Sequence, residues 1–243
     1  MSQDWFASWF DTPYYHMLYE YRDETEAQTF IDALFTYLNP TKQSEILDLA
    51  CGRGRHAIYI NSKGFNVTGY DLAEENINHA KQFENDRLHF EVRDMRNTMG
   101  VAQFNYVFNL FTSFGYFEAD KEDEMAMRNI SNCLKPGGIL ILDFMNSHKV
   151  EQNLVPQETK TVNGITFNIN RYIEDDQIVK EIKFNAEGCN LRFEERVKKY
   201  LLEDFEALYR KAGLVPKAYF GSLDLKPYNQ ETSDRLIMIV SKA

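Results

Sequence analysis

Two glycines and three aspartates stand where the chain could bind a nucleotide-like cofactor. Gly52 and Gly54 follow a short apolar segment and precede a helical pattern, and neither carries a Cβ. A ligand can therefore press against bare backbone at the amino terminus of the next helix. Asp48 lies inside that apolar segment, and Asp71 and Asp94 directly follow two later ones. Carboxylates at these places can accept hydrogen bonds from hydroxyl and amino groups.

The spacing of the glycine turn alone fits more than one class of cofactor. The run Gly52-x-Gly54-x-x-Ala57 satisfies the dinucleotide fingerprint, and Asp71 lies where a ribose-binding acid belongs. Asp48 argues against that class, because dinucleotide binders usually keep an apolar residue four positions before Gly52.

The elements that must position these residues alternate between helix and strand. Helical patterns cover 24–38, 55–63, 73–83, 120–134 and 201–212, and strand patterns cover 45–50, 65–70, 88–92, 104–110, 139–144, 215–221 and 235–241. Segment 139–144 reads as fully apolar and follows a Pro136-Gly137-Gly138 turn. Strands this apolar, separated by helices, indicate a parallel sheet that is covered on both faces.

Between residues 158 and 200 the pattern changes, because no helical period is present. Asn163-Gly164 separates two alternating runs, which is a strong hairpin signal. Segments 174–176 and 185–188 supply two further turns. We therefore predict a small antiparallel meander inserted after the fifth strand.

Taken in order, these motifs resemble those of the class I S-adenosylmethionine-dependent methyltransferases. The resemblance rests on Leu47–Gly54, Gly69–Leu72, Arg93–Met95, Asn109–Tyr116 and Leu134–Leu142, and it covers about residues 45–145. It departs from the family pattern where Ala50 replaces the first glycine. It implies an α/β fold: a Rossmann-like seven-stranded mixed sheet with helices on both faces, an antiparallel last strand, and the β insertion after strand 5.

The resemblance also implies a role for each matched position, with S-adenosylmethionine as cofactor and S-adenosylhomocysteine as product. The glycine turn would line the methionine part, the second-strand aspartate would accept from the ribose hydroxyls, and the third-strand pair would hold the adenine. The end of the fourth strand would face the sulfonium. The full cofactor-binding set, including three residues of the amino-terminal segment, is Tyr14, Tyr15, Arg22, Ala50, Gly52, Gly54, Asp71, Leu72, Asp94, Met95, Asn109, Leu110 and Phe111.

Structural roles remain open for the same residues. The two glycines also fit an ordinary tight turn, and Asp71 also fits a helix cap. Asp94 also fits an ion pair with Arg93 or Arg96.

The amino-terminal segment is rich in aromatic residues and is expected to cover the core or to close over the cofactor as a lid. Tyr14, Tyr15 and Arg22 loosely match the lid of related small-molecule enzymes, in which an arginine fork meets the cofactor carboxylate. A membrane-surface role is disfavoured, because Asp4 and Asp11 interrupt the segment and no basic residue precedes Arg22.

A catalytic base is not identified, because methyl transfer asks mainly for alignment. Tyr116 and His148 are candidates, with Asn146 and His16 as further ones, and for each a packing or surface role is the more common outcome. His56 is expected to pack against or cap the helix that follows the glycine turn.

Length and composition bound the function. The 243 residues fit a single methyltransferase domain with four parts: a helical lid (1–40), the cofactor-binding core (41–150), the β insertion (155–200), and a closing helix and strand pair (201–243). A net charge of −10 argues against a nucleic-acid partner.

Neither a secretion signal nor a membrane span is found. Three scattered cysteines show no metal spacing and suggest reduced thiols in a cytoplasmic protein.

The leading hypothesis is methyl transfer to a small-molecule N, O or C acceptor. The alternatives are an RNA or protein methyltransferase, a nicotinamide-dependent oxidoreductase, and a non-catalytic S-adenosylmethionine-binding protein. The β insertion is expected to wall the acceptor pocket, to form a contact in a homodimer, or both. The sequence names neither the acceptor nor its reacting atom.

Overall fold

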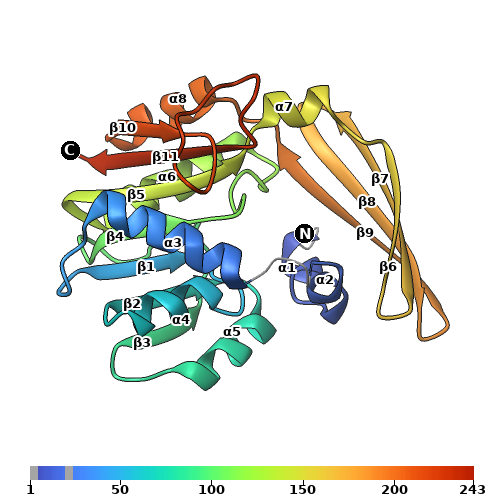
Figure 1. Ribbon diagram of the computed structural model, residues 1–243, viewed down its shortest axis with the longest axis horizontal. Coiled ribbons are helices and arrows are strands. Elements are labelled where there is room, and N and C mark those ends of the chain that lie inside the picture. Colours follow the sequence, from blue (N-terminus) through green and yellow to red (C-terminus); the bar gives the residue numbers. More distant parts are fainter. Residues whose placement is uncertain (1–4, 20–23) are drawn as a thin grey trace.

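The computed structural model describes residues 5–19 and 24–243, and these residues form two sheets with flanking helices (Figure 1). The core sheet contains β1 (Glu45–Leu49), β2 (Asn66–Asp71), β3 (Leu88–Val92), β4 (Phe104–Asn109), β5 (Leu134–Met145), β10 (Leu214–Phe220) and β11 (Arg235–Lys242). The small sheet contains β6 (Gln157–Val162), β7 (Ile165–Glu174), β8 (Gln177–Ala186) and β9 (Cys189–Lys198). The helices are α1 (Trp5–Trp9), α2 (Pro13–Leu18), α3 (Glu24–Leu38), α4 (Arg55–Ser62), α5 (Glu74–Ala80), the 3-10 helix η1 (Lys81–Phe83), α6 (Asp120–Cys133), α7 (Ser147–Gln152) and α8 (Leu202–Ala212).

The core sheet has the strand order β10-β11-β5-β4-β1-β2-β3. Its pairings are parallel except those of β11, which runs antiparallel to both β5 and β10. The predicted seven-stranded mixed sheet with an antiparallel last strand is thus confirmed. Because the chain reverses its direction of travel across the sheet between β1 and β4, a crevice opens at the carboxyl ends of these two strands.

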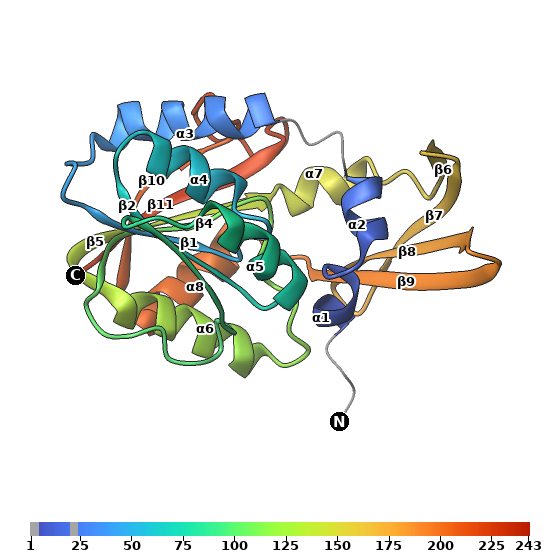
Figure 2. The ribbon, with the colours of Figure 1, turned by 90° about the horizontal axis from the view of Figure 1, so that it is seen from below.

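Helices cover both faces of the core sheet, with α3, α4 and α5 on one side and α6 and α8 on the other (Figure 2). Neighbouring residues of β1 show why. Ile46 packs with Phe30 of α3 and Ile60 of α4, whereas Leu47 packs with Met127 of α6. Since successive strand residues point to opposite faces, a strand buried on both sides must be apolar throughout.

The predicted turn at Pro136-Gly137-Gly138 is wrong in one respect, because these residues lie inside β5. That strand begins at Leu134, directly after α6. Its pairing with β4 is irregular between Leu134 and Ile139, so the segment forms a bulge within the strand. Regular pairing resumes at Ile139, which is where the strand was predicted to begin.

The predicted meander is confirmed in the four antiparallel strands of the small sheet. Its three hairpins each turn on two residues with positive φ: Asn163 and Gly164, Asp175 and Asp176, Glu187 and Gly188. Left-handed backbone at both turn positions matches the twist of the flanking strands. Helix α7, which was not predicted, joins β5 to this sheet.

Helices α1 and α2 lie between the core sheet and the small sheet (Figures 1 and 2). Trp9 and Leu18 are almost fully buried, and they pack with Phe167, Ile182 and Phe184 of the small sheet. The aromatic amino-terminal segment therefore fills the gap between the two sheets.

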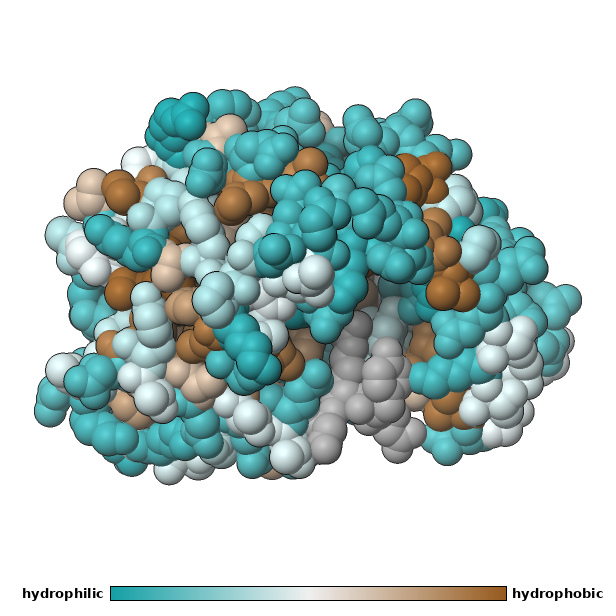
Figure 3. All heavy atoms as spheres, turned by 45° about the horizontal axis from the view of Figure 1, so that its top comes forward, coloured by the Kyte–Doolittle hydropathy of each residue, from teal (hydrophilic) through white to brown (hydrophobic). Residues whose placement is uncertain are grey.

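The face drawn in Figure 3 is mainly hydrophilic, with apolar residues in small separate patches. None of the helices in the described part of the chain combines the length and the apolar character that crossing a membrane requires.

Candidate functional site

A cavity of about 1020 Å³ lies where the carboxyl ends of the core strands face α1, α2 and the small sheet. The loops that follow β1, β2, β3 and β4 all contribute to its lining. The predicted site residues that line it are Tyr15, Ala50, Gly52, Asp71, Leu72, Asp94, Met95, Leu110, Phe111 and Tyr116. Residues far apart in the sequence thus meet in one space, which is large enough for a cofactor together with a small second ligand.

The two glycines of the turn after β1 differ in what surrounds them. Gly52 has a φ of +56°, and a Cβ added there would meet nothing within 4 Å. Gly54 has a φ of +83°, and a Cβ there would lie 2.7 Å from the ring of Phe90. Gly52 therefore leaves open space beside the cavity. Gly54 is not among the lining residues; it is the N-cap residue of α4, and Phe90 leaves no room there for a side chain, so its role as a cofactor contact stays a prediction.

Asp71, at the end of β2, holds two loops together. One carboxylate oxygen accepts the Gly52 backbone N–H at 2.7 Å, and the other accepts the Ala73 N–H at 2.8 Å. The helix-cap alternative for Asp71 is wrong, because Ala73 is the N-cap residue of α5. Burial raises the pKa of Asp71. Since a carboxylate can accept about four hydrogen bonds, two acceptor positions are left for a diol.

Asp48 is 1% exposed inside β1, and it accepts the backbone N–H of Ala57 at 3.1 Å. This bond ties the first turn of α4 to the strand beneath it. Burial raises the pKa of Asp48 to about 7. The carboxyl group also lines the cavity directly below the glycine turn.

Asp94, after β3, forms the ion pair that the sequence left as an alternative. The Arg96 guanidinium donates to both of its carboxylate oxygens, with the shortest N···O distance at 2.6 Å. Arg96 also pairs with Glu122 of α6 at 2.9 Å. Asp94 and Met95 nevertheless remain part of the cavity lining.

The loop after β4 has a strained backbone that is fixed by a hydrogen bond to β5. Phe111 and Thr112 have φ values of +59° and +62°, which non-glycine residues rarely adopt. The Phe111 N–H donates to one carboxylate oxygen of Asp143 at 2.7 Å, and Nε of Arg235 donates to the other at 2.7 Å. Segment 139–144 is therefore not fully apolar, because Asp143 in β5 is a buried carboxylate that fixes this loop.

The ring of Phe111 is covered by two residues of the first turn of α4. The imidazole of His56 stacks on it, with centroids 5.3 Å apart and planes 25° apart, and the Arg55 guanidinium lies 4.3 Å from its centroid. Burial lowers the pKa of His56 to about 3, so the imidazole is neutral. The predicted packing role of His56 is confirmed.

Besides Gly54, three predicted site residues lie outside the cavity lining. Tyr14 packs against Phe184 of the small sheet, because it lies about 100° around α2 from Tyr15. Asn109 is fully buried, and its amide donates to the Leu49 carbonyl at 3.1 Å, which ties β4 to β1. His148 is on α7, where it contacts Glu231 at 3.0 Å, away from the cavity.

Arg22, also predicted to contact the cofactor, lies outside the described residues.

The remaining candidates for a base have structural partners. The Tyr116 hydroxyl donates to the Thr112 carbonyl, and its ring packs on Trp5 at 5.3 Å. His16 lines the cavity, and its Nε2 lies 2.7 Å from the Asn76 side-chain oxygen; burial lowers its pKa. The Asn146 amide donates to backbone carbonyls of residues 230 and 233, which holds that loop.

Sequence reasoning missed the residues that reach the cavity from distant elements. Arg235 comes from β11, and Arg171, Lys180 and Glu195 come from the small sheet. A usable signal exists for the three small-sheet residues and for Asp143, the partner of Arg235. Asp143 is a carboxylate within an apolar strand, as Asp48 is, and the three small-sheet residues are charges at apolar positions of alternating strands.

In the described ranges, 5–19 and 24–243, no cluster of three or more histidine, cysteine or acidic side chains is arranged to hold a metal ion.

Comparison with known proteins gives one match to a family and several relatives. Residues 46–138 match a family model described as a methyltransferase domain. YqeM of Bacillus subtilis (strain 168), named as a methyltransferase, is 35% identical over 114 residues, which are 46% of each chain. The dTDP-3-amino-3,4,6-trideoxy-alpha-D-glucopyranose N,N-dimethyltransferase of Streptomyces venezuelae is 31% identical over 101 residues, 41% of this chain and 42% of that protein. The chain thus spans less than half the length of these two curated relatives.

The whole described fold has a counterpart among solved structures. The crystal structure of a S-adenosylmethionine-dependent methyltransferase from Clostridium acetobutylicum ATCC 824 aligns with a TM-score of 0.78. The alignment covers 95% of this chain and 96% of that one, at 22% sequence identity. A likeness at this identity shows the fold, including the small sheet.

Proposed function

We propose that this chain, which has the fold of the class I S-adenosylmethionine-dependent methyltransferases and matches their domain over residues 46–138, transfers a methyl group from S-adenosylmethionine to a small-molecule acceptor. One observation carries the proposal. The loops after four parallel strands meet in a single cavity, with the open backbone of Gly52 and the carboxylate of Asp71 side by side in its wall.

The residues in this wall fit the cofactor. Space beside Gly52 leaves room for the methionine part to lie against backbone, and Asp71 has acceptor capacity for the ribose hydroxyls. Leu72 and Met95 offer apolar contacts on the adenine side, where Asp94 would accept from the amino group. When bound, the cofactor supplies an electrophilic methyl group on a sulfonium.

The chain contributes alignment and the exclusion of water. The strained loop at Phe111 and Thr112, fixed by Asp143, presents a rigid wall at the end of β4. Trp5 and Phe10 of the amino-terminal segment close the cavity from the other side together with Tyr116. Holding two reactants in line in such an enclosure is the main source of rate in a transfer of this kind.

No general base is required for a neutral amine acceptor. His56, with its low pKa, is a poor base, and the Tyr116 hydroxyl already donates to a backbone carbonyl. A hydroxyl acceptor would need a base with a pKa near 7. Asp48 has such a pKa, but it is 1% exposed inside β1 and accepts the Ala57 N–H on the cofactor side of the cavity, so these observations favour an amine nucleophile. The related Streptomyces venezuelae protein is likewise named as an N,N-dimethyltransferase.

A small acceptor is preferred over nucleic acid or protein for two reasons. The cavity is enclosed by α1, α2 and the small sheet, and the chain has a net charge of −10, which repels a phosphate backbone. We further infer a reducing, cytoplasmic location from the free thiols of Cys51, Cys133 and Cys189.

Calorimetric titration and a transfer assay test the proposal. The protein should bind S-adenosylhomocysteine and not NADH, and it should move labelled methyl groups from S-adenosylmethionine into the small-molecule fraction of a cell extract. Tight binding of NADH alone would indicate an oxidoreductase, and label in total RNA or protein would indicate a macromolecular substrate. Cofactor binding without any transfer would indicate a non-catalytic binding protein.

A further inference from the structure

The small sheet carries a row of charged residues across β7, β8 and β9 on the face that it turns toward the cavity. Arg171 of β7 pairs in register with Lys180 of β8, and Lys180 pairs with Glu195 of β9. Directly opposed residues on neighbouring strands point to the same face, so the three side chains lie side by side. All three line the cavity that also contains the glycine turn.

On β7, β8 and β9 the rest of this face is apolar on both sides of the row, while the edge strand β6 adds Glu158 and Lys160 to the same face. Two residues away, Ile169, Ile182 and Phe193 form the next row, and on the other side Ile178 pairs with Val197. The first of these rows packs with α1 and α2. Charges placed within an apolar face cost desolvation free energy and need a compensating role.

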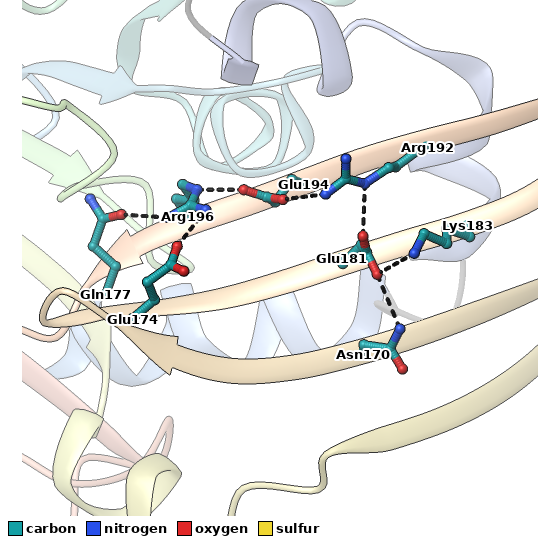
Figure 4. A network of polar contacts seen from close by, with 8 residues as sticks. All are labelled: Asn170, Glu174, Gln177, Glu181, Lys183, Arg192, Glu194 and Arg196. Carbon is teal, nitrogen blue, oxygen red and sulfur yellow. Dashed lines mark hydrogen bonds and ion pairs between the residues drawn. The ribbon is translucent and has the colours of Figure 1, made fainter.

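On the opposite face of the sheet, the charged side chains compensate one another by forming ion pairs. Figure 4 shows Glu181 accepting from Lys183 and Arg192, both at 2.7 Å, while Arg196 pairs with Glu174 at 2.8 Å. The Lys183 ammonium is the main reason why the pKa of Glu181 falls to about 2. This outer network is a ladder of mutual pairs and requires no ligand.

Within the inner row, Glu195 serves the amino-terminal helices. It accepts the Trp9 indole N–H at 2.7 Å, and the Tyr19 hydroxyl lies 2.8 Å from both of its oxygens. The Lys180 ammonium donates to the Tyr19 hydroxyl and forms a salt bridge with Glu195 at 3.8 Å. Arg171 pairs with Glu158 at the edge of the sheet.

The row therefore places two neighbouring cations in the wall of the cavity. The chain as a whole has 27 lysines and arginines against 37 acidic residues. In the cavity the excess is of the opposite sign, since the described lining has more arginines and lysines than aspartates and glutamates. Three of those carboxylates, Asp48, Asp71 and Asp94, come from the core-sheet loops on the cofactor side.

We propose that Lys180 and Arg171 bind an anionic group of the methyl acceptor, a carboxylate or a phosphate, while Glu195 anchors the amino-terminal helices beside it. The inference rests on the proposed function and narrows its substrate class to anionic small molecules. An arginine fork and a lysine ammonium on adjacent strands suit the several oxygens of such a group.

The test is calorimetric titration of the protein, saturated with S-adenosylhomocysteine, with inorganic pyrophosphate and separately with succinate. Lys180→Met and Arg171→Gln should each weaken the binding by about tenfold or more, as expected for a lost charge-assisted hydrogen bond. Lys183→Met on the same strand and Arg192→Gln on β9 remove the same charges from the outer face, and these controls should stay within about twofold of wild type. Lys180→Arg keeps the charge and should retain most of the affinity.

Each outcome decides the proposal. Binding of pyrophosphate alone indicates a phosphorylated acceptor, and binding of succinate alone indicates a carboxylic one. No saturable binding to wild type, or equal losses in inner-face and outer-face variants, overturns the assignment. Affinity for S-adenosylhomocysteine is measured on every variant and should not change. If the wild type does not bind it, the proposed function fails, and the same titration of the protein alone still decides the role of the row.

Discussion

The side chain of Asp143 accepts the backbone N–H of Phe111 at 2.7 Å and so fixes the loop after β4 against the end of β5. The same carboxylate accepts Nε of Arg235 from β11 at 2.7 Å and is itself 0% exposed. One buried group thus holds three elements at the mouth of the cavity.

Replacing this carboxylate should destabilise the protein strongly. Asp143→Ala leaves the Arg235 guanidinium and the Phe111 N–H without their partner, and we expect a loss of about 3–5 kcal/mol in the free energy of unfolding. Urea denaturation measures this loss. Asp234→Ala is the control, since that carboxylate is 82% exposed in its pair with Lys149 and should change stability by less than about 1 kcal/mol. Similar losses in the two variants would contradict the role of Asp143.

The two glycines of the turn should respond differently to substitution by alanine. Gly54→Ala brings a Cβ to 2.7 Å from the ring of Phe90 at a φ of +83°, so we expect it to destabilise the fold by about 2–4 kcal/mol. Gly52→Ala meets open space and should cost only about 1–2 kcal/mol of backbone strain. It should nevertheless weaken S-adenosylhomocysteine binding more than its stability loss suggests, because the new methyl group enters the cavity. Thermal melting and calorimetric titration separate the two effects.

Asp71→Ala should weaken the binding of S-adenosylhomocysteine by about 1–3 kcal/mol, the range for lost hydrogen bonds to a charged group. It should also lower stability, since two backbone N–H groups lose their acceptor. The exposed Asp86 is a control of the same charge, and Asp86→Ala should leave affinity unchanged. Unchanged affinity in Asp71→Ala would show that the ribose does not lie there.

Asp48 should make stability fall as the pH rises. Burial raises its pKa from 3.8 to about 7, so between these values the folded protein holds a proton that the unfolded chain has released. The favourable contribution is complete below pH 3.8 and is lost as the pH rises to about 7. Asp48→Asn removes this dependence. As the pH rises across this range, the unfolding free energy of the variant minus that of wild type should therefore increase, by up to about 4 kcal/mol.

Urea denaturation of both proteins at pH 4, 5.5 and 7 measures the Asp48 effect. His56 acts with the opposite sign, because its low pKa favours the folded state as the pH rises, but it is present in both proteins and cancels in the difference. Asp86→Asn should run parallel to wild type. A difference between Asp48→Asn and wild type that does not vary with pH would rule out a proton on Asp48.

Glu195→Gln should loosen the amino-terminal helices. The carboxylate accepts both the Trp9 indole and the Tyr19 hydroxyl, and an amide offers only one oxygen in its place. Backbone amides within residues 5–19 should then exchange hydrogen faster, while those of the core sheet stay protected. Glu194→Gln, whose side chain lies in the outer network, is the matched control (Figure 4). Equal exchange in both variants would show that Glu195 does not anchor this segment.

The sequence predicted the scaffold well because its signals are local. Apolar runs such as that of β1 and the hairpin signal Asn163-Gly164 each depend on backbone conformation over a few residues. The residues at the carboxyl ends of the parallel strands were also predictable, since strand order brings those ends to one edge. Ala50, Gly52, Asp71 and Leu110 accordingly meet in the cavity.

Side-chain direction and long-range pairing were not predictable in the same way. Tyr14 and Tyr15 are neighbours in the sequence, yet only Tyr15 lines the cavity, because packing on the small sheet sets the rotation of α2. Asn109 turns to the β1 backbone, and Asp94 is paired with Arg96. Such outcomes depend on which partners the fold brings near.

The sequence by itself therefore determined the core sheet, the meander and the position of the cofactor loops, because periodicity and turn chemistry are properties of short segments. Only the tertiary structure decided what surrounds those loops. Asp143 reaches Phe111, which is 32 positions away in the chain, and the docking of the small sheet brings Arg171, Lys180 and Glu195 to the far wall of the cavity. No local pattern encodes such contacts, since they arise when burial of apolar faces docks the small sheet and the amino-terminal helices against the core.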